Sequence, residues 1–487
     1  MSKEIKDLNP ATIWSFFYDL TQIPRPSKNE ERVVDYVRKF GEDRGLKTIV
    51  DDVGNVIIKK PATPGMENRK VVLLQSHLDM VPQKNSGTVH DFEKDPIEAF
   101  IDGEWVKARG TTLGADNGMG VAATLAVLNS DELVHGPVEA LFTIDEETGM
   151  TGAFGLKKGI FDGDIMLNMD SEEEGELYVG CAGGLDANIT FSYEEVSVPA
   201  GVSAFEITVK GLKGGHSGLD IILGRGNANK LLFRFITHVI KQHSARLAHV
   251  NGGGLRNAIP REATAVLVIP SGKENDLKNS IAEFQKIYAS ELAEADPNVI
   301  LDLKKSEAPS SLIDEKTQYY LINGIISCPN GVMRMSNSMP GLVETSTNLA
   351  SVYSEQGEIT LKCLMRSSVD SSRDELAEMV ESVFTLANAK VNFAGAYPGW
   401  KPDMNSEILV VMKTVYKALY GKIPEIKGIH AGLECGLIGG VYPELDMISF
   451  GPTINFPHSP DEKVHIKSVE KFWVFLIETL KNIPVKK

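Results

Sequence analysis

Short apolar runs alternate with helical stretches between residues 70 and 185. The runs VVLLQ, VEALFTI and DIMLNM are shorter than a typical helix, and segments of helical character separate them. Continuous apolar runs of this length are typical of strands that are buried on both faces of a parallel sheet. The pattern therefore predicts an α/β layer with a mainly parallel sheet.

The chain on either side of this layer continues the mixture of helix and strand. Two helical patterns, ATIWSFFYDLTQI and NEERVVDYVRKFGEDRG, precede it, and TIVDDVGNVIIKK predicts two strands around a tight turn at Gly54. After residue 398 the alternation resumes, with the apolar run DMISF between two helical stretches. These outer segments are predicted to belong to the same α/β domain.

The pattern changes near residue 187. Alternating, strand-rich stretches and long helical segments follow one another, and a similar order returns before residue 397. We interpret this repeat as two copies of a β-α-β type module. Residues 187–397 are therefore predicted to form an inserted domain, and residues 1–186 and 398–487 to form the two parts of a discontinuous one.

Composition limits the classes of protein to consider. The 487 residues exceed what one core supports, and 42% hydrophobic and 24% charged residues are ordinary for a globular protein. A net charge of −16 argues against nucleic acid as a partner. No apolar run is long enough for a membrane span, the N-terminus has no apolar signal core, and the four cysteines form no CxxC pair. These features predict a cytoplasmic protein with reduced thiols and no membrane partner.

Residues with metal-binding side chains lie where the apolar runs end. They are His77 and Asp79 after VVLLQ, Glu146 and Glu147 after VEALFTI, Asp170 after DIMLNM and His458 after DMISF, with Asp116 before an apolar helical stretch. Ligands collect beyond the carboxyl ends of the strands in open α/β sheets, so these residues are predicted to converge. Mixed histidine and carboxylate ligation suits zinc, with manganese or cobalt as substitutes.

Each of these residues alone has an ordinary explanation. A histidine and an aspartate at a strand end are often merely solvated, an aspartate before a helix is a common N-cap, and acidic loops are frequent in an acidic protein. The set as a whole favours a metal site, in which Asp79 would orient His77 and Asp116 would bridge two cations. Of the adjacent Glu146 and Glu147, one would bind metal and the other would face the substrate as a proton acceptor.

Five segments taken together resemble a known family. SHLDMVP, GADNGMGVA, DEETGMTGA, NMDSEE and FPHSPDE resemble the motifs of the co-catalytic zinc metallopeptidases, which include carboxypeptidase G, aminoacylase, carnosinase and bacterial dipeptidases. The resemblance implies two zinc ions, one held by His77, Asp116 and Asp170 and the other by Asp116, Glu147 and His458. It implies Glu146 as the general base and Asp79 as the partner of His77. It also implies a cis peptide bond between Asp116 and Asn117.

The resemblance further implies a fold, namely a zinc-exopeptidase-like α/β catalytic domain with an inserted ferredoxin-like α+β lid domain, here doubled. Three lid residues match family motifs. His216 in KGLKGGHSG would stabilise the oxyanion, and Asn257 in GGGLRNAIP and Arg366 in LMRSSVD would hold the substrate carboxylate. A loop histidine and a surface strand arginine are the ordinary alternatives. The roles of His430 and Glu434 in GIHAGLECG stay open.

The predicted activity is the hydrolysis of dipeptides, including Xaa-His dipeptides, by a water activated between two divalent metal ions with Glu146 as the base. An N-acyl amino acid deacylase or a tripeptide aminopeptidase would use the same metal centre. A non-catalytic peptide-binding protein would have no need of Glu146. The predicted partner is a small peptide. It stays open whether the chain forms a homodimer, and whether His216 acts in its own chain or in the partner's.

Overall fold

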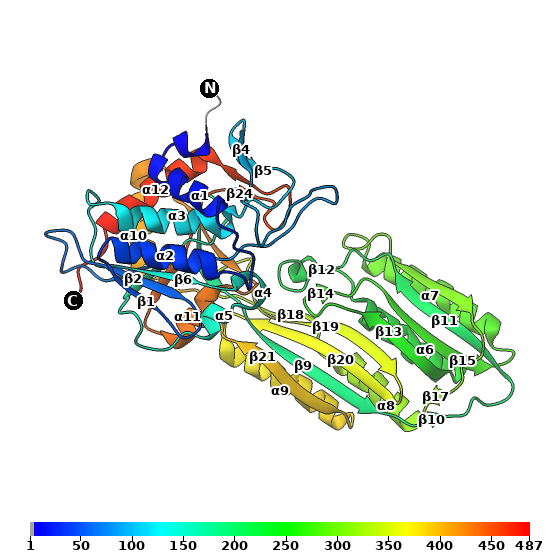
Figure 1. The fold of residues 1–487 in the computed structure, drawn as a ribbon. Coiled ribbons are helices and arrows are strands. Elements are labelled where there is room, and N and C mark those ends of the chain that lie inside the picture. The colour runs from blue at the N-terminus through cyan, green and yellow to red at the C-terminus, as the bar shows by residue number, and fades with distance from the viewer. Residues whose placement is uncertain (1–3) are drawn as a thin grey trace. The chain divides into compact units, whose positions relative to one another are not determined.

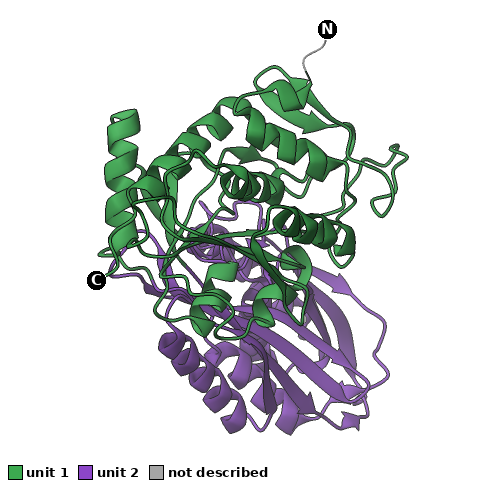
Figure 2. Ribbon diagram, turned by 60° about the vertical axis from the view of Figure 1, so that its left-hand side comes forward, with its two compact units in different colours: residues 1–180, 402–428, 433–487 green, residues 181–401, 429–432 purple. Residues whose placement is uncertain are grey.

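The computed structural model describes residues 4–487 and divides into two compact units (Figure 2). Unit 1 contains the described residues up to Gly180, then residues 402–428 and 433–487, and unit 2 contains residues 181–401 and 429–432. The domain boundaries predicted from the sequence, 1–186, 187–397 and 398–487, stay a prediction. Residues 1–3 lie outside the part of the chain that the structure describes. The prediction assigned residues 429–432 to the same domain as their neighbours, whereas the structure places them in unit 2.

Unit 1 is built on an eight-stranded sheet (Figure 1). Its four central strands are parallel, in the order β6 (Val138–Thr143), β3 (Val72–His77), β7 (Ile165–Asn168) and β23 (Asp446–Ser449). The flanking strands are β1 (Lys47–Val50) and β2 (Val56–Lys60) on one side, and β8 (Glu176–Cys181) and β22 (Glu425–Ile429) on the other. Every residue of β3 and β6 is buried. The mainly parallel α/β sheet predicted from the apolar runs is therefore confirmed.

Helices bury apolar faces against this sheet and against each other. The main helices of unit 1 are α1 (Ala11–Thr21), α2 (Glu31–Asp43), α3 (Ala115–Asn129), α10 (Glu407–Tyr420), α11 (Glu434–Val441) and α12 (Ile466–Lys481). In α1, Ile13, Trp14, Phe17 and Leu20 follow the helical period and are buried. Helix α3 packs against both α1 and β3, which explains why nearly all of its side chains are buried.

A small four-stranded sheet in unit 1 joins segments that are far apart in sequence. It consists of β24 (Ile454–Asn455), β25 (Lys463–His465), β5 (Trp105–Ala108) and β4 (Ala99–Asp102). The loop between β24 and β25 carries His458. His458 is therefore placed by this hairpin and its pairing with β5, not directly by the end of β23 as the sequence analysis had it.

Unit 2 contains one antiparallel sheet formed by two halves, each with the order β-α-β-β-α-β. One half consists of β11 (Val202–Lys210), α6 (Ala228–His243), β13 (Arg246–Gly253), β15 (Ala263–Pro270), α7 (Glu274–Glu291) and β16 (Ile300–Lys305). The other half consists of β9 (Gly183–Ser192), α8 (Glu315–Ser327), β19 (Val343–Glu355), β20 (Glu358–Ser367), α9 (Asp370–Leu386) and β21 (Lys390–Tyr397). In space, both halves have the strand order fourth, first, third, second, which is the ferredoxin-like arrangement.

The two halves of unit 2 meet where β13 pairs with β19. The predicted doubling of the ferredoxin-like insert is thus confirmed, but the expected order of the copies is wrong. The first half interrupts the second, because β9 precedes β11 in the chain yet pairs with β20 and β21.

Three further expectations concern single features. The peptide bond between Asp116 and Asn117 is cis, as predicted. All four cysteines are buried, and the described residues form no disulfide. Between residues 4 and 487, no helix is long and apolar enough to cross a membrane.

Candidate metal centre

Three parallel strands of unit 1 bring four of the predicted residues to one edge of the sheet. His77 is the last residue of β3, which pairs with both β6 and β7. Glu146 and Glu147 begin the short helix α4 (Glu146–Gly149) after β6, and Asp170 follows β7. Because parallel strands end at the same edge, the side chains converge there as predicted.

Asp116 lies between two histidines. Its Oδ1 is 3.1 Å from Nε2 of His77, and its Oδ2 is 3.2 Å from Nε2 of His458. The same ring nitrogens also face one further carboxylate each, at 3.2 Å for His77 and Asp170 and at 2.9 Å for His458 and Glu147. Two sets of possible ligands therefore share the carboxylate of Asp116.

The ligand atoms of each set are close enough together to surround one ion. Those of His77, Asp116 and Asp170 all lie within 4.8 Å of one another, and so do those of Asp116, Glu147 and His458. Oε1 of Glu147 is buried and has no hydrogen-bond partner, and no lysine or arginine of the described chain forms an ion pair with Asp116, Glu147 or Asp170. This mixture of imidazole and carboxylate ligands with unbalanced negative charge fits divalent cations such as zinc.

The charges of the site depend on one another when no cation is bound. Hydrogen bonds to Asp116 and Glu147 raise the pKa of His458 to about 11. Burial lowers the pKa of His77, but the neighbouring carboxylates, led by Asp170, outweigh burial and hold that pKa well above its ordinary value. Burial raises the pKa of Asp170 to about 6. The carboxylates of the two sets therefore favour positive charge at this place.

Asp79 holds the ligand-bearing segments in position. Its Oδ1 lies 3.3 Å from Nδ1 of His77, an ion-pair contact whose angle does not make it a hydrogen bond. The same carboxylate accepts the backbone N–H groups of Glu146 at 3.0 Å and Glu147 at 3.2 Å, and the hydroxyl of Ser27 at 2.8 Å. Although burial opposes its charge, these contacts lower the pKa of Asp79 to about 2. Asp79 therefore lies where a carboxylate that orients His77 should be.

The structure distinguishes Glu146 from Glu147. Glu147 contacts His458, whereas the side chain of Glu146 forms no hydrogen bond or ion pair with a described residue. Glu146 nevertheless belongs to a set of possible ligand atoms with His77 and Glu147, so it lies at the centre. Burial raises its pKa well above the ordinary value of a glutamate. Of the two glutamates, Glu146 is thus the one whose carboxylate has no hydrogen-bond or ion-pair partner among the described residues, and its role as the base stays a prediction.

Two residues that support the centre have no role in the sequence analysis. Glu462 accepts the backbone N–H groups of residues 113–116, at 2.7 to 3.3 Å. Arg25 donates to the carbonyl oxygens of Leu78 and Asp79, both at 2.9 Å, and to that of Gly114 at 2.5 Å. The only signal for Glu462 is its place in the segment FPHSPDE, and Arg25 lies in the break PRPS.

Glu434 and His430, whose roles were left open, are both buried. Glu434 is fully buried in unit 1 and accepts hydrogen bonds from Gln75 at 2.6 Å and Thr143 at 2.7 Å. Burial raises its pKa to about 7. In unit 2, Nε2 of His430 lies 2.7 Å from the hydroxyl of Ser346, and burial lowers the pKa of His430 to about 3. Each residue also keeps one buried side-chain atom without a hydrogen-bond partner, namely Oε1 of Glu434 and Nδ1 of His430, so their roles stay open.

The remaining predicted residues lie together in unit 2. His216 on β12 (Gly215–His216) pairs with Ala258 of β14 (Ala258–Ile259), next to Asn257. The backbone N–H of Ser217 donates to the carbonyl oxygen of Asn257 at 2.7 Å. Arg366 on β20 lies 3.5 Å from the hydroxyl of the same serine. His216, Asn257 and Arg366 thus form one group, as their common assignment to the lid predicts, and their individual roles stay predictions.

Comparison with known proteins agrees with this arrangement. The sequence profile of the peptidase family M20/M25/M40 matches residues 73–482. The chain is similar to the cytosol non-specific dipeptidase of Escherichia coli (strain K12), with 50% identity over 483 residues that cover 99% of this chain and 100% of the relative. It is also similar to the crystal structure of aminoacylhistidine dipeptidase from Vibrio alginolyticus, with 50% identity, a TM-score of 0.96 and coverage of 100% and 99%.

A more distant likeness shows the fold alone. The aminopeptidase PepT from Bacillus cereus ATCC 10987 matches with 16% identity, a TM-score of 0.58 and coverage of 98% of this chain and 99% of that one. The sequence resemblance and the predicted fold class are confirmed by these comparisons together.

Proposed function

Since the chain belongs to peptidase family M20/M25/M40, we propose that it is a metal-dependent dipeptidase that also cleaves Xaa-His dipeptides. The two relatives with 50% identity are named as a cytosol non-specific dipeptidase and an aminoacylhistidine dipeptidase. The name of the first relative also supports a cytoplasmic location for this chain. The donor set favours two zinc ions, with cobalt or manganese as substitutes.

The observation that carries the proposal is the position of Asp116 between the two ligand sets. Each of its carboxylate oxygens faces the ring nitrogen of a different histidine, at 3.1 and 3.2 Å. His77 and Asp170 would complete the site of one ion, and Glu147 and His458 that of the other. Two bound cations supply a water of lowered pKa and polarise the scissile carbonyl.

Glu146 would move the proton in this reaction. Its raised pKa suits a group that takes a proton from the water, holds it, and returns it to the amine of the leaving amino acid. Asp79 fixes the backbone of Glu146 and contacts His77, so it aligns the base and one ligand at the same time.

His216 of unit 2 is proposed to donate a hydrogen bond to the oxyanion. Its Nδ1 accepts the backbone N–H groups of Gly218 and Leu219, both at 3.1 Å, so the proton of the neutral ring belongs on Nε2. Burial lowers the pKa of His216, and the nearby charge of Arg366 lowers it further, which keeps the ring neutral at pH 7. A neutral ring with a free Nε2–H group is the form that such a donor needs.

Arg366, with Asn257, is proposed to hold the carboxylate of the substrate. Arg366 is only 6% exposed, and its guanidinium group forms no ion pair with a carboxylate of the described residues. It donates hydrogen bonds to the hydroxyls of Ser217 at 3.5 Å and Tyr397 at 3.2 Å. A buried cation without a counter-ion is stabilised when an anion binds. Recognition of a terminal carboxylate would limit the substrates to short peptides.

The experiment that tests the function uses the protein after removal of metal by a chelator. Zinc is restored, and the products formed from alanyl-histidine, alanyl-alanyl-histidine and N-acetyl-histidine are identified and quantified. We expect zinc-dependent cleavage of the dipeptide, slower cleavage of the tripeptide and none of the acylated amino acid, with Glu146→Gln as the inactive control. Preference for N-acetyl-histidine would favour a deacylase, and preference for the tripeptide would favour an aminopeptidase.

A further inference from the structure

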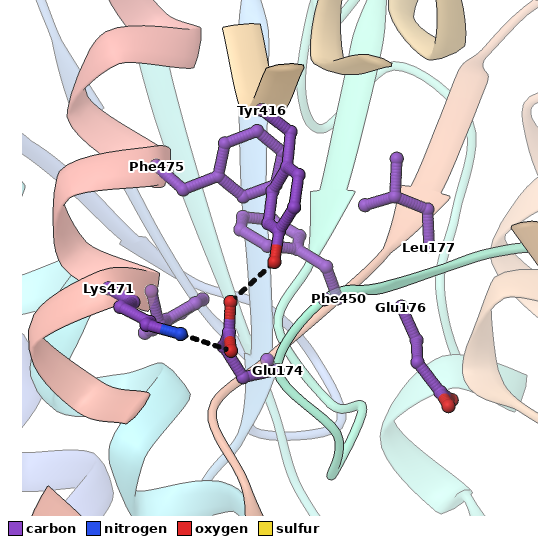
Figure 3. A pocket seen from close by; sticks show the side chains of 10 residues that line it. Glu174, Glu176, Leu177, Tyr416, Phe450, Lys471 and Phe475 are labelled. Carbon is purple, nitrogen blue, oxygen red and sulfur yellow. Dashed lines mark hydrogen bonds and ion pairs between the residues drawn. The ribbon is translucent and has the colours of Figure 1, made fainter. Parts of the chain in front are cut away.

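Buried polar clusters in this chain differ in whether their groups already have partners. In unit 1, Figure 3 shows Glu174 between Tyr416 and Lys471, which donate hydrogen bonds to its carboxylate at 2.6 and 3.0 Å. Each carboxylate oxygen has its own donor, so this cluster has a structural explanation. Two thiols in unit 2 are different, because they face each other and can react with each other.

Cys328 and Cys363 bring two sulfur atoms into contact. Cys363 lies on β20, and Cys328 is the residue that follows α8. Their Sγ atoms are 4.0 Å apart, and both residues are buried, with 2% and 0% of their surface exposed. Because 35 positions separate them in the chain, it is the fold that pairs them. The sulfur atoms would have to approach by about 2 Å to reach the length of a disulfide bond.

A cation lies beside this pair. The ammonium group of Lys230, on α6, donates hydrogen bonds to three carbonyl oxygens at the C-terminal end of α8. They belong to Ile325 (2.6 Å), Ile326 (3.0 Å) and Cys328 (2.8 Å). A cation at this end of a helix is stabilised by the carbonyl groups that the helix leaves without a donor. The ammonium group is therefore fixed next to the backbone of Cys328.

The two thiols are not equivalent. The thiol of Cys363 lowers the pKa of Cys328; burial opposes this, and the ammonium group of Lys230 adds to it. The contact with Cys328 and burial raise the pKa of Cys363 well above its ordinary value. Cys328 is therefore the thiol that loses its proton more easily, and the thiolate is the form that attacks an oxidant.

The pair lies close to the surface of unit 2. Lys230 is only half-buried, and Ile326, whose carbonyl oxygen it contacts, is 42% exposed. The end of α8 where Cys328 lies is thus near solvent, which favours access by a small, uncharged oxidant.

We propose that Cys328 and Cys363 are a site of reversible oxidation, at which hydrogen peroxide converts the two thiols into a disulfide. The thiolate of Cys328 attacks one oxygen of the peroxide, the O–O bond breaks and a sulfenic acid forms, while hydroxide leaves and takes up the proton that the thiol released. The sulfur of Cys363 then attacks that of Cys328. The S–S bond forms, the S–O bond breaks, and the hydroxyl group leaves as water with the proton of Cys363. Two thiols are thus oxidised to one disulfide, and one peroxide is reduced to two waters.

The disulfide would tie the end of α8 to β20, the strand that carries Arg366. Its formation uses no residue of the metal centre, so it does not depend on peptide hydrolysis. In a reducing compartment the bond would be transient, as is usual for disulfides that respond to oxidants there.

The test treats the folded, zinc-loaded protein with hydrogen peroxide and then blocks the remaining thiols. We expect the number of thiols to fall from four to two per chain, and peptide mass spectrometry to find residues 328 and 363 in one cross-linked pair. Dithiothreitol should restore all four thiols. Cys435→Ser, which removes a buried cysteine elsewhere in the chain, should form the same disulfide.

Single variants separate the roles of the three residues. Cys363→Ser should gain oxygen at Cys328, as sulfenic or sulfinic acid, whereas Cys328→Ser should leave Cys363 unreacted. Lys230→Gln should slow disulfide formation about tenfold, because less of Cys328 is thiolate, and Lys230→Arg, which keeps the charge, should react at nearly the wild-type rate. Three results would overturn the proposal: wild-type thiols that all survive the peroxide, a disulfide that involves Cys181 or Cys435, or oxidation only after unfolding in urea.

Discussion

Glu462 holds the backbone of Asp116 although 346 residues separate the two in sequence. One carboxylate oxygen of Glu462 accepts the N–H of Asp116 at 3.3 Å and that of Ala115 at 2.7 Å, and the other accepts those of Leu113 and Gly114. Glu462 and His458 lie in the same loop between β24 and β25. One hairpin therefore supplies a predicted ligand and also fixes the start of the helix that carries the shared carboxylate.

Replacing Glu462 by Gln should weaken the whole centre. The amide offers one oxygen where the carboxylate offers two, and its NH2 group would face backbone donors in a buried site. We expect the free energy of unfolding to fall by about 1–3 kcal/mol and metal affinity to fall about 10- to 100-fold. Urea unfolding and metal titration measure the two effects. Asp461→Asn, in the exposed neighbour, is the control, and unchanged metal affinity in Glu462→Gln would contradict the supporting role.

The two adjacent glutamates should respond differently to the same change. Glu146→Gln should keep both metal ions and lose about 10²–10⁴-fold in kcat, because general-base catalysis contributes that much. Glu147→Gln should lose metal as well, because Glu147 contacts His458 and belongs to a ligand set. Metal content after dialysis and kcat on alanyl-histidine separate the two. A loss of less than about tenfold in Glu146→Gln would reject its role as the base.

The positions of the main candidate ligands could be predicted because regular strands place them. His77 ends a strand, and Glu147 and Asp170 come shortly after strands; the continuous apolar runs mark these strands as buried and parallel, and parallel strands end at a common edge. His458 was also predicted as a ligand, but its expected route to the site, from the end of the run DMISF, was wrong. The strands that place it, β24 and β25, have two and three residues and show no periodicity that a sequence could reveal.

Other features depend on contacts that leave no local pattern. Glu462 looks like one more acidic residue in an acidic loop, and its role follows only from the backbone N–H groups at the start of α3 that need an acceptor. In unit 2, the repeated order of helices and strands predicted the doubling. That β9 belongs to the second half is decided by its pairing with β20, whose residues lie well over 100 positions away in the chain.

Removing the shared carboxylate should cost the protein both metal ions. Asp116 faces both histidines, whereas Asp170 faces only His77. We therefore expect Asp116→Ala to retain neither ion after dialysis. Asp170→Ala should lose the ion of the set that contains His77 and keep the other. Elemental analysis of the purified variants gives the stoichiometry. Two ions per chain in Asp116→Ala would show that Asp116 does not bridge them.

Metal affinity should rise with pH. A histidine must be neutral to bind metal, but without a cation the pKa of His458 is about 11 and that of His77 is also raised. At pH 7 both rings therefore carry protons that metal binding must release. Each released proton should improve the apparent Kd about tenfold per pH unit between pH 6 and 8. Competition with a chelator measures this dependence. The slope of log Kd against pH should be smaller by about one in His458→Ala, because one proton fewer is released. An affinity that does not change with pH would contradict the protonated state.

The last prediction concerns His216 in unit 2. If its Nε2–H donates to the oxyanion, His216→Ala should lower kcat by about 10²–10³-fold and leave metal content and fold unchanged. Gly218 and Leu219 fix the ring through its Nδ1, so His216→Gln should not restore the rate. Near-normal turnover of alanyl-histidine by His216→Ala would show that this residue is only part of the loop.

Mixing two inactive variants tells which chain His216 serves. Chains with Glu146→Gln and chains with His216→Ala are combined under two different affinity tags, and mixed dimers are isolated by both. If a site uses His216 of another chain, the mixed dimer regains one site with both residues intact. Its activity should then be about half that of a wild-type dimer. If His216 serves its own chain, no activity returns. We expect no recovery, because unit 2 contains both ferredoxin-like halves within a single chain. Recovered activity would show that a second copy completes the site.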